Sequence, residues 1–240
     1  MPQEHHHHPS APLVVAASLA MIAGFVDAHI YMNVAPVFVA NMSGNLVHLG
    51  MLSGLEDWSG ASASAATLVA FTAGVVIATW HHDRYVRSGR RLRPDFLLWV
   101  EAALLVGVVA ILMQFDIGFT ARPIARDYPV FLIGGIAMGL QSAALRRVGS
   151  VAVATTYGTG AIVRVGEKII LGARSAARVG DTKRRVTVAV LLSVILCYVF
   201  GAALAARIGH GPAWLLIPAG GLAAIAVSTH LGSMQPEREG

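Results

Sequence analysis

The sequence predicts an all-α membrane protein of about six transmembrane helices in two inverted three-span repeats, each with a re-entrant or broken polar helix. Three observations support this fold class. Of the 240 residues, 55% are hydrophobic and only 13% are charged, against about 25% charged residues in soluble domains. The apolar residues form runs of the length that membrane helices need, about 20 residues each. Two polar segments between these runs share a motif.

Six apolar runs have the length and low polarity of spanning helices. They cover residues 13–31, 61–80, 96–115, 129–145, 186–206 and 214–229. Two further segments, 36–55 and 150–163, are too polar or too short to cross the membrane easily. We expect both to enter the membrane and return, and eight crossings are the alternative.

Basic residues set the orientation, because short loops rich in Lys and Arg stay in the cytoplasm. One such loop lies within 84–93, and two more, 146–147 and 174–185, flank segment 150–163. If that segment crossed the membrane, one flanking cluster would lie outside, so a re-entrant course fits better. We therefore expect a multi-pass protein of the inner (plasma) membrane with both termini in the cytoplasm.

The net charge of +5 at pH 7 comes from these loops, so lipid is the expected partner and nucleic acid is not. Cys197 is the single cysteine, which excludes an intrachain disulfide. Four histidines at 5–8 lack a defined geometry for a metal ion, and they indicate a solvated tail or the remainder of an expression tag. We predict no metal and no cofactor, and the sequence is compatible with a homo-oligomer.

An internal repeat divides the chain. The motif [ST]-G-x-x-V-x-x-G begins at Ser43 and again at Thr159, 116 residues later. The preceding helices match at a shift of 115, since Gly24 corresponds to Gly139 within small residues spaced by four. Three spans per half is an odd number, so the second half enters the membrane in the opposite sense. We expect repeat 1 over 13–115 and repeat 2 over 116–232, between tails at 1–12 and 233–240, in one membrane domain.

Interrupted helices in inverted repeats are typical of secondary transporters, where the broken elements meet near the midplane and bind substrate or ion. A helix beginning at Ser43 or Thr159 would direct amide donors inward and favour an anion, although these hydroxyls could simply cap the breaks. The candidate binding residues of the two tips are Asn41, Ser43, Gly44, Asn45 and His48, then Thr155, Thr156, Thr159 and Gly160.

Asp27 lies well inside the first run, where a carboxylate must be paired, hydrated or protonated. It could handle a coupling proton or cation, or it could tie the first helix to the tips through hydrogen bonds. Its repeat counterpart is Ser142, beside Gln141, and both are candidate binding residues.

Glu101 lies about two turns into run 96–115. Pairing with Arg146 or Arg147 is the simpler explanation of a carboxylate at that position, and a functional role is the alternative.

Three stretches resemble the YoaK-like family of bacterial membrane proteins: Gly24-Phe25-Val26-Asp27-Ala28, Asn41-Met42-Ser43-Gly44-Asn45 and Thr155-Thr156-Tyr157-Gly158-Thr159-Gly160. The resemblance extends from about residue 17 to 206. The family usually has Thr-Gly-Asn at the first tip, where this chain keeps the hydroxyl with Ser43. The family is one of unknown function, so the resemblance implies a membrane fold and important motifs, but no substrate, cofactor or catalytic role.

We predict a secondary transporter or permease of a small solute or ion, with its central site at the two tips. A channel-like pore that uses the same tips as a filter is an alternative, and a structural or partner-binding membrane protein is another. We do not expect an enzyme, because the sequence shows no metal-ligand cluster, nucleophile elbow or Ser-His-Asp ordering.

Overall fold

The computed structural model describes residues 10–88, 94–144, 147–148, 151–152, 160, 162–167 and 181–234. These residues are almost entirely helical. The main helices are α1 (Ser10–Asn33), α2 (Met42–Gly54), α3 (Trp58–Arg87), α4 (Pro94–Gln114), α5 (Tyr128–Ala144), α7 (Asp181–Ile208) and α8 (Leu216–Met234). Short 3-10 helices, η1 (Ala125–Asp127) and η2 (Pro212–Leu215), precede α5 and α8, and strands β1 (Arg147–Val148) and β2 (Val151–Ala152) pair antiparallel.

Five segments are long and apolar enough to cross a membrane. They are Leu13–Asn33, Trp58–Arg87, Asp95–Gln114, Thr187–Ile208 and Pro212–Leu231. Large apolar side chains such as Val76 and Leu196 are exposed on them, as suits helices that face lipid. The chain is therefore an all-α membrane protein, as predicted. The remaining predicted span, 129–145, corresponds to α5, whose 17 residues fall below the usual length of about 20.

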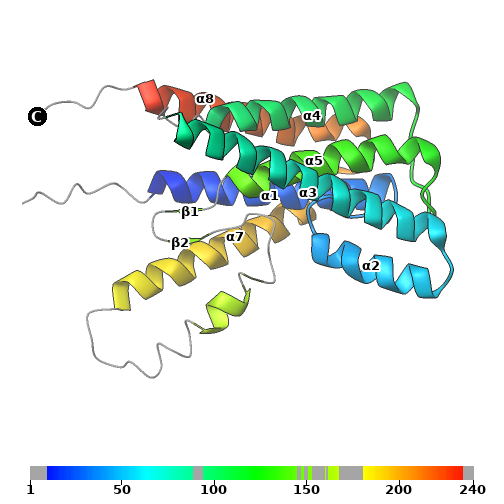
Figure 1. The fold of residues 1–240 in the computed structure, drawn as a ribbon, viewed down its shortest axis with the longest axis horizontal. Helices are drawn as coiled ribbons and strands as arrows, with labels where there is room; N and C mark the ends of the chain where they lie inside the picture. The colour runs from blue at the N-terminus through cyan, green and yellow to red at the C-terminus, as the bar shows by residue number, and fades with distance from the viewer. Residues whose placement is uncertain are drawn as a thin grey trace, which may run out of the picture.

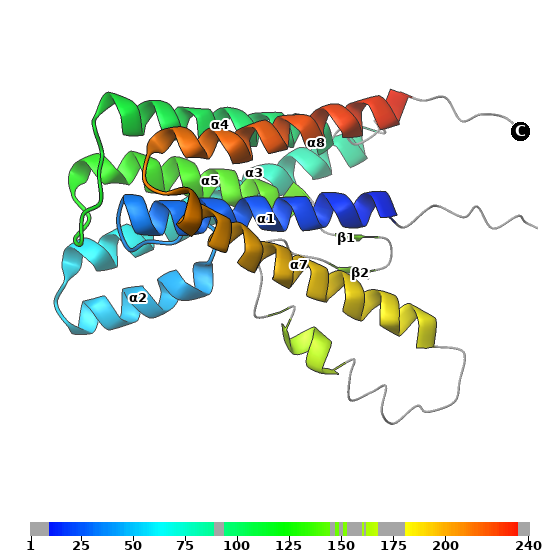
Figure 2. The ribbon, with the colours of Figure 1, turned by 180° about the vertical axis from the view of Figure 1, so that it is seen from behind.

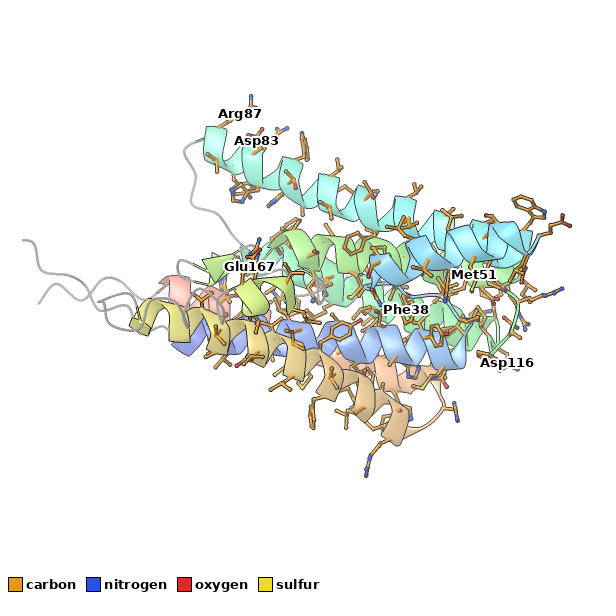
Figure 3. All side chains as sticks on the ribbon, turned by 90° about the horizontal axis from the view of Figure 1, so that it is seen from below. Phe38, Met51, Asp83, Arg87, Asp116 and Glu167 are labelled. Carbon is orange, nitrogen blue, oxygen red and sulfur yellow. The ribbon has the colours of Figure 1, made fainter. Side chains whose placement is uncertain are left out.

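The helices form one bundle, and those other than α2 alternate in direction along the chain (Figure 1, Figure 2). Helices α1, α4 and α7 run one way, while α3, α5 and α8 run the other way. The beginning of α1 and the end of α8 therefore lie at the same end of the bundle. Asp83 and Arg87 lie at this end and Asp116 at the opposite one (Figure 3). We call them the Arg87 end and the Asp116 end.

Glycines bring the backbones together at the interfaces of α1 with α7 and of α3 with α5, the most extensive among the described helices. A Cβ atom at Gly24 or Gly201 would collide with a backbone carbonyl of the facing helix, and so would one at Gly74 or Gly139. Close backbone approach allows van der Waals packing, which holds membrane helices together where lipid removes the hydrophobic driving force. Two of these four positions, Gly24 and Gly139, belong to the small-residue pattern of the predicted repeat.

The sequence [ND]-x-S-G begins both α2 and α3, at Asn41 and Asp57. In each, the Oδ1 atom accepts a hydrogen bond from the serine hydroxyl two residues later, at 2.8 and 2.9 Å, and from the glycine amide three residues later, at 3.3 Å. Such caps satisfy amides that the first helical turn leaves free. The hydroxyl of Ser59 and the amide of Gly60, with Arg122 nearby, hold the pKa of the Asp57 carboxyl below its usual value.

The loop 34–41 folds back along α1 before α2 begins. Its amides at 39–41 reach Asp27, which lies six residues, or about 9 Å of helix, before the end of α1. Val34, Val37 and Val39 of the loop are at most 1% exposed. The 13 residues of α2 then run beside α3 towards the Asp116 end (Figure 1). Segment 36–55 is therefore a buried loop followed by a short helix, and not one spanning helix.

Candidate functional site around Asp27

The carboxylate of Asp27 receives four hydrogen bonds. The backbone amides of Val39 and Ala40 donate to its Oδ1 atom at 2.6 and 2.7 Å, and the amide of Asn41 donates to Oδ2 at 2.9 Å. The hydroxyl of Tyr198, from α7, donates to Oδ2 at 2.5 Å. The carboxylate is 2% exposed, so these four donors replace water as its solvation shell.

This arrangement makes Asp27 the point at which α1, the folded-back loop and α7 meet. An ionised carboxylate offers about four acceptor positions, and the four donors match that capacity. Bonds from amides to a charged oxygen are also stronger than those between neutral groups. Of the two sequence hypotheses for Asp27, the hydrogen-bonded tie describes this geometry, since an added proton or cation would have to displace one of the four donors.

Asn45 holds the peptide of Phe38 from both sides. Its Oδ1 atom accepts from the Phe38 amide at 3.1 Å, and its Nδ2 atom donates to the Phe38 carbonyl at 2.5 Å. The Phe38 ring lies against Gly44, where a Cβ atom would come within 2.7 Å of the ring. The ring also stacks with Tyr31 and His48, at centroid distances of 4.6 and 5.8 Å. Asn45, Gly44 and His48 therefore fix the loop around Phe38.

At the start of α2, the amides of Met42, Gly44 and Asn45 donate to groups of the same chain. Asn41 is the N-cap, and its side chain accepts the Gly44 amide and the hydroxyl of the exposed Ser43. The inward-directed donors lie just upstream of the helix, and the anion that they bind is Asp27. The predicted anion-binding tip is thus occupied by a carboxylate of the same chain.

The second predicted tip lies mostly outside the described residues, which exclude Thr155, Thr156 and Thr159; Gly160 is described as helical. In the preceding helix α5, Gln141 is buried and its side-chain amide nitrogen, Nε2, donates to the carbonyl of Leu19 at 2.9 Å. Gln141 therefore links α5 to α1, and its neighbour Ser142 is half-buried.

A cavity of about 310 Å³ opens at the Asp116 end, between the ends of α1 and α4 and the turn before η2. Its polar side chains are His29, Asn33 and His210, and its apolar wall includes Leu112 and Phe119. Sequence motifs did not select this site, because His210 is 177 residues from the Asn33 side chain that it contacts. Within the described ranges, no three His, Cys, Asp or Glu side chains gather to hold a metal ion.

Asn33 fixes the hydrogen-bonding pattern of both histidines. Its Nδ2 atom donates to the His29 carbonyl at 2.9 Å, and its Oδ1 atom accepts from Nδ1 of His210. The same Nδ2 lies 3.4 Å from Nδ1 of His29, so the proton of a neutral His29 belongs on Nε2. That Nε2 is buried, with no hydrogen-bond partner among the described residues. The cavity wall therefore holds a donor that lacks an acceptor.

Glu101, which the repeat motifs did not select, is a second buried residue of interest whose polar atoms lack a hydrogen-bond partner among the described residues. It lies in α4 with no exposed surface, and neither carboxylate oxygen has a partner among the described residues. The side chains of Arg146 and Arg147, its expected partners, lie outside those residues. The sequence did single out Glu101 in one respect, because a carboxylate well inside an apolar run is unusual.

Comparison with known proteins places these residues in a family. Residues 15–228 match the family described as "Protein of unknown function (DUF1275)". The chain belongs to this family. It is also similar to the UPF0700 transmembrane protein YoaK of Bacillus subtilis (strain 168), with 30% identity over 153 residues, or 63% of this chain and 64% of that relative. No solved structure matches the chain.

Membership in the DUF1275 family confirms the resemblance that the three motifs indicated. The matched region contains Asp27, both predicted tips, Glu101 and the cavity at the Asp116 end. The match to YoaK covers just under two thirds of that relative, and its printed name states a transmembrane protein without an activity.

Proposed function

We propose that this chain is a secondary transporter of a small solute, with six spanning helices and a central site formed around the broken elements. The observation that carries the proposal is the loop 34–41, which re-enters the bundle and is held there by Asp27. Irregular backbone at membrane depth is tolerated where it packs against protein or lines a cavity. Broken elements of this kind are the usual binding regions of secondary transporters.

An inverted repeat is consistent with the packing. The counterparts α1 and α5, α3 and α7, and α4 and α8 run in opposite directions. If each helix is replaced by its counterpart in the other repeat, the interface between α1 and α7 corresponds to the interface between α5 and α3. In both interfaces, glycines allow the two backbones to approach closely. Gly24 would correspond to Gly139, and Gly201 to Gly74. In this arrangement α5 is the sixth span, and its 17 residues lie at the lower limit of about 17–25.

The orientation follows from the distribution of charge. Arg84 and Arg87 lie in the last turn of α3, and residues 84–93 contain five arginines in all. The positive-inside rule puts such a short loop in the cytoplasm. The Arg87 end would then be cytoplasmic, with both termini, and the cavity at the Asp116 end would open to the outside.

The cavity at the Asp116 end, whose lining includes Val34 at the start of the folded-back loop, is the opening through which the solute would reach the broken element. Its volume of about 310 Å³ lies at the lower end of the range for ligand pockets, roughly 300–1,000 Å³. The unsatisfied Nε2 of His29 calls for a hydrogen-bond acceptor. We therefore expect a small solute that carries an acceptor group such as a carboxylate.

The proposal is tested in two steps, first by measuring ligand binding and then by measuring transport. The purified protein is heated with a panel of small carboxylates, amino acids, sugars and nucleosides, because a ligand that binds only the folded state raises Tm. Each stabilising compound is then offered, radiolabelled, to proteoliposomes with an imposed proton or sodium gradient. A transporter accumulates the compound only when a gradient is present. Equal flux with and without a gradient would indicate a channel and overturn the proposal, as would the lack of any flux.

A matched pair of variants tests the cavity. A Cβ atom at Gly118, which lines the cavity, or at Gly107, which lies on α4 away from it, would meet nothing within 4 Å. Gly118→Leu should fill part of the cavity and remove the stabilisation by the solute, while Gly107→Leu should keep it. Equal stabilisation of both variants would show that the solute binds elsewhere.

A further inference from the structure

Glu101 lies on a helix stripe that is otherwise apolar and fully packed. The stripe consists of residues spaced by three or four positions, which lie on one face of α4: Glu101, Leu105, Val108 and Leu112. All four are at most 2% exposed. Helix α4 packs against α5, α8 and η2. Glu101 therefore lies in the protein interior, at the junction of the two halves proposed above, and not on the lipid-facing surface.

The surroundings of Glu101 differ from those of Asp27. Asp27 has four donors around its carboxylate, whereas both oxygens of Glu101 lack a partner among the described residues. An ionised carboxylate buried without donors or a counter-charge is very costly, and such a group becomes neutral instead. The bundle thus holds one carboxyl group built for the ionised form and one built for the protonated form.

Ionisable side chains on the neighbouring elements are engaged elsewhere. Helix α5 carries Tyr128, which hydrogen bonds with Ser62 at 2.6 Å. Helix α8 carries His230, which contacts Asp95 at the start of α4 at 3.0 Å. The short helix η2 has no ionisable side chain. Helix α3 also contacts α4, because the His81 ring stacks on Phe96 at a centroid distance of 5.2 Å, and His29 of α1 lines a cavity together with Leu112 of α4. Among the described residues, none of these groups is hydrogen-bonded to Glu101.

We propose that Glu101 is the binding site of the proton that couples transport, an inference that rests on the proposed function. The carboxylate takes up a proton from water on one side and becomes a carboxylic acid. In the packed state described here, the acid is fully buried inside the bundle. A rearrangement of the two halves that exposes it to the other side allows the proton to leave to water, which restores the carboxylate. One proton crosses in each cycle and no other reactant is needed.

Infrared spectroscopy of the protein in lipid nanodiscs tests the protonated state directly. The wild type should show the carbonyl stretch of a protonated carboxylic acid at neutral pH, and Glu101→Gln should remove that band. Glu101→Asp should keep a shifted band, and Glu167→Gln, which changes an exposed carboxylate at the Arg87 end (Figure 3), should leave it unchanged. Absence of the band in the wild type would mean an ionised Glu101, as in a pair with Arg146, and would overturn the inference. A band that persists in Glu101→Gln would do the same.

Transport separates this inference from the function on which it rests. With any compound that the wild type accumulates, a gradient of one pH unit should support roughly tenfold accumulation for one proton per solute. Glu101→Gln should abolish that accumulation, and Glu167→Gln should retain it. Accumulation by Glu101→Gln under a pH gradient would refute the proton site while leaving the transporter intact. If the wild type transports nothing, the coupling role fails together with the proposed function, even with the infrared band present.

Discussion

Asp27 and Glu101 show how the same chemical group can have opposite surroundings in one bundle. Asp27 receives donors from the loop and from α7, whereas Glu101 receives none from the described residues. Sequence position alone indicated that both lie inside apolar runs. It could not indicate their partners, because three of the donors to Asp27 are backbone amides, which every residue except proline carries.

Removing the charge of Asp27 should destabilise the protein. Asp27→Asn directs an amide NH₂ group at donors, leaving at least one buried amide unsatisfied at a cost of about 1–3 kcal/mol. Tyr198→Phe removes a single bond and should cost about 1 kcal/mol. In thermal unfolding of the purified proteins, Tm should therefore be highest for the wild type, lower for Tyr198→Phe and lowest for Asp27→Asn. Wild-type stability of Asp27→Asn would show that the carboxylate does not hold the loop.

At the scale of elements, the spanning helices were predictable and the folded-back loop was predictable only in part. Long apolar runs indicated α1, α3, α4, α7 and α8 directly, and the polar Asn41–Asn45 stretch indicated an interruption. The course of the loop depends on Asn45 gripping the Phe38 peptide, a contact between a side chain and a backbone that leaves no periodic signal. The second predicted interruption, Thr155 to Gly160 within segment 150–163, lies mostly outside the described residues.

Glycine substitutions should separate tight helix interfaces from open ones. A Cβ atom at Gly139 would strike the Phe71 carbonyl, while one at Gly107 would meet nothing within 4 Å. Gly139→Ala should lower stability by about 1–3 kcal/mol through overpacking, and Gly24→Ala should behave alike at its own interface. Gly107→Ala should be neutral or stabilising, since alanine favours a helix by about 1 kcal/mol. Thermal unfolding measures all three, and equal effects would contradict the close packing of the two interfaces.

At the scale of the molecule, hydropathy predicted a bundle of apolar membrane helices better than it predicted the candidate site. The basic residues near Arg87 and the acidic Asp116 mark opposite ends of the bundle (Figure 3). The cavity at the Asp116 end escaped prediction because it joins His29 and Asn33 of α1 to His210, which follows α7. Only the closed bundle brings these residues together.

Cysteine labelling in intact cells checks the topology. In a Cys197→Ala background, single cysteines replace the exposed Ser88, Ala121 and Ala213. A membrane-impermeant maleimide should label positions 121 and 213 from outside and position 88 only after lysis, because α4, α5 and α7 alternate in direction. If positions 121 and 213 were instead labelled from opposite sides of the membrane, the result would support eight membrane crossings and contradict six.

The contact between Tyr198 and Asp27 also bears on how the chain is synthesised. The loop amides lie 12–14 positions after Asp27, whereas Tyr198 follows it by 171. At about 5–20 residues per second, the nascent carboxylate acquires its backbone donors almost at once and its hydroxyl donor only after roughly 10–30 s of further elongation. The first helix and its loop can therefore associate early, and α7 completes the shell of Asp27 near the end of translation. A ribosome stalled before residue 198 would hold a first helix whose carboxylate still has one unfilled acceptor position.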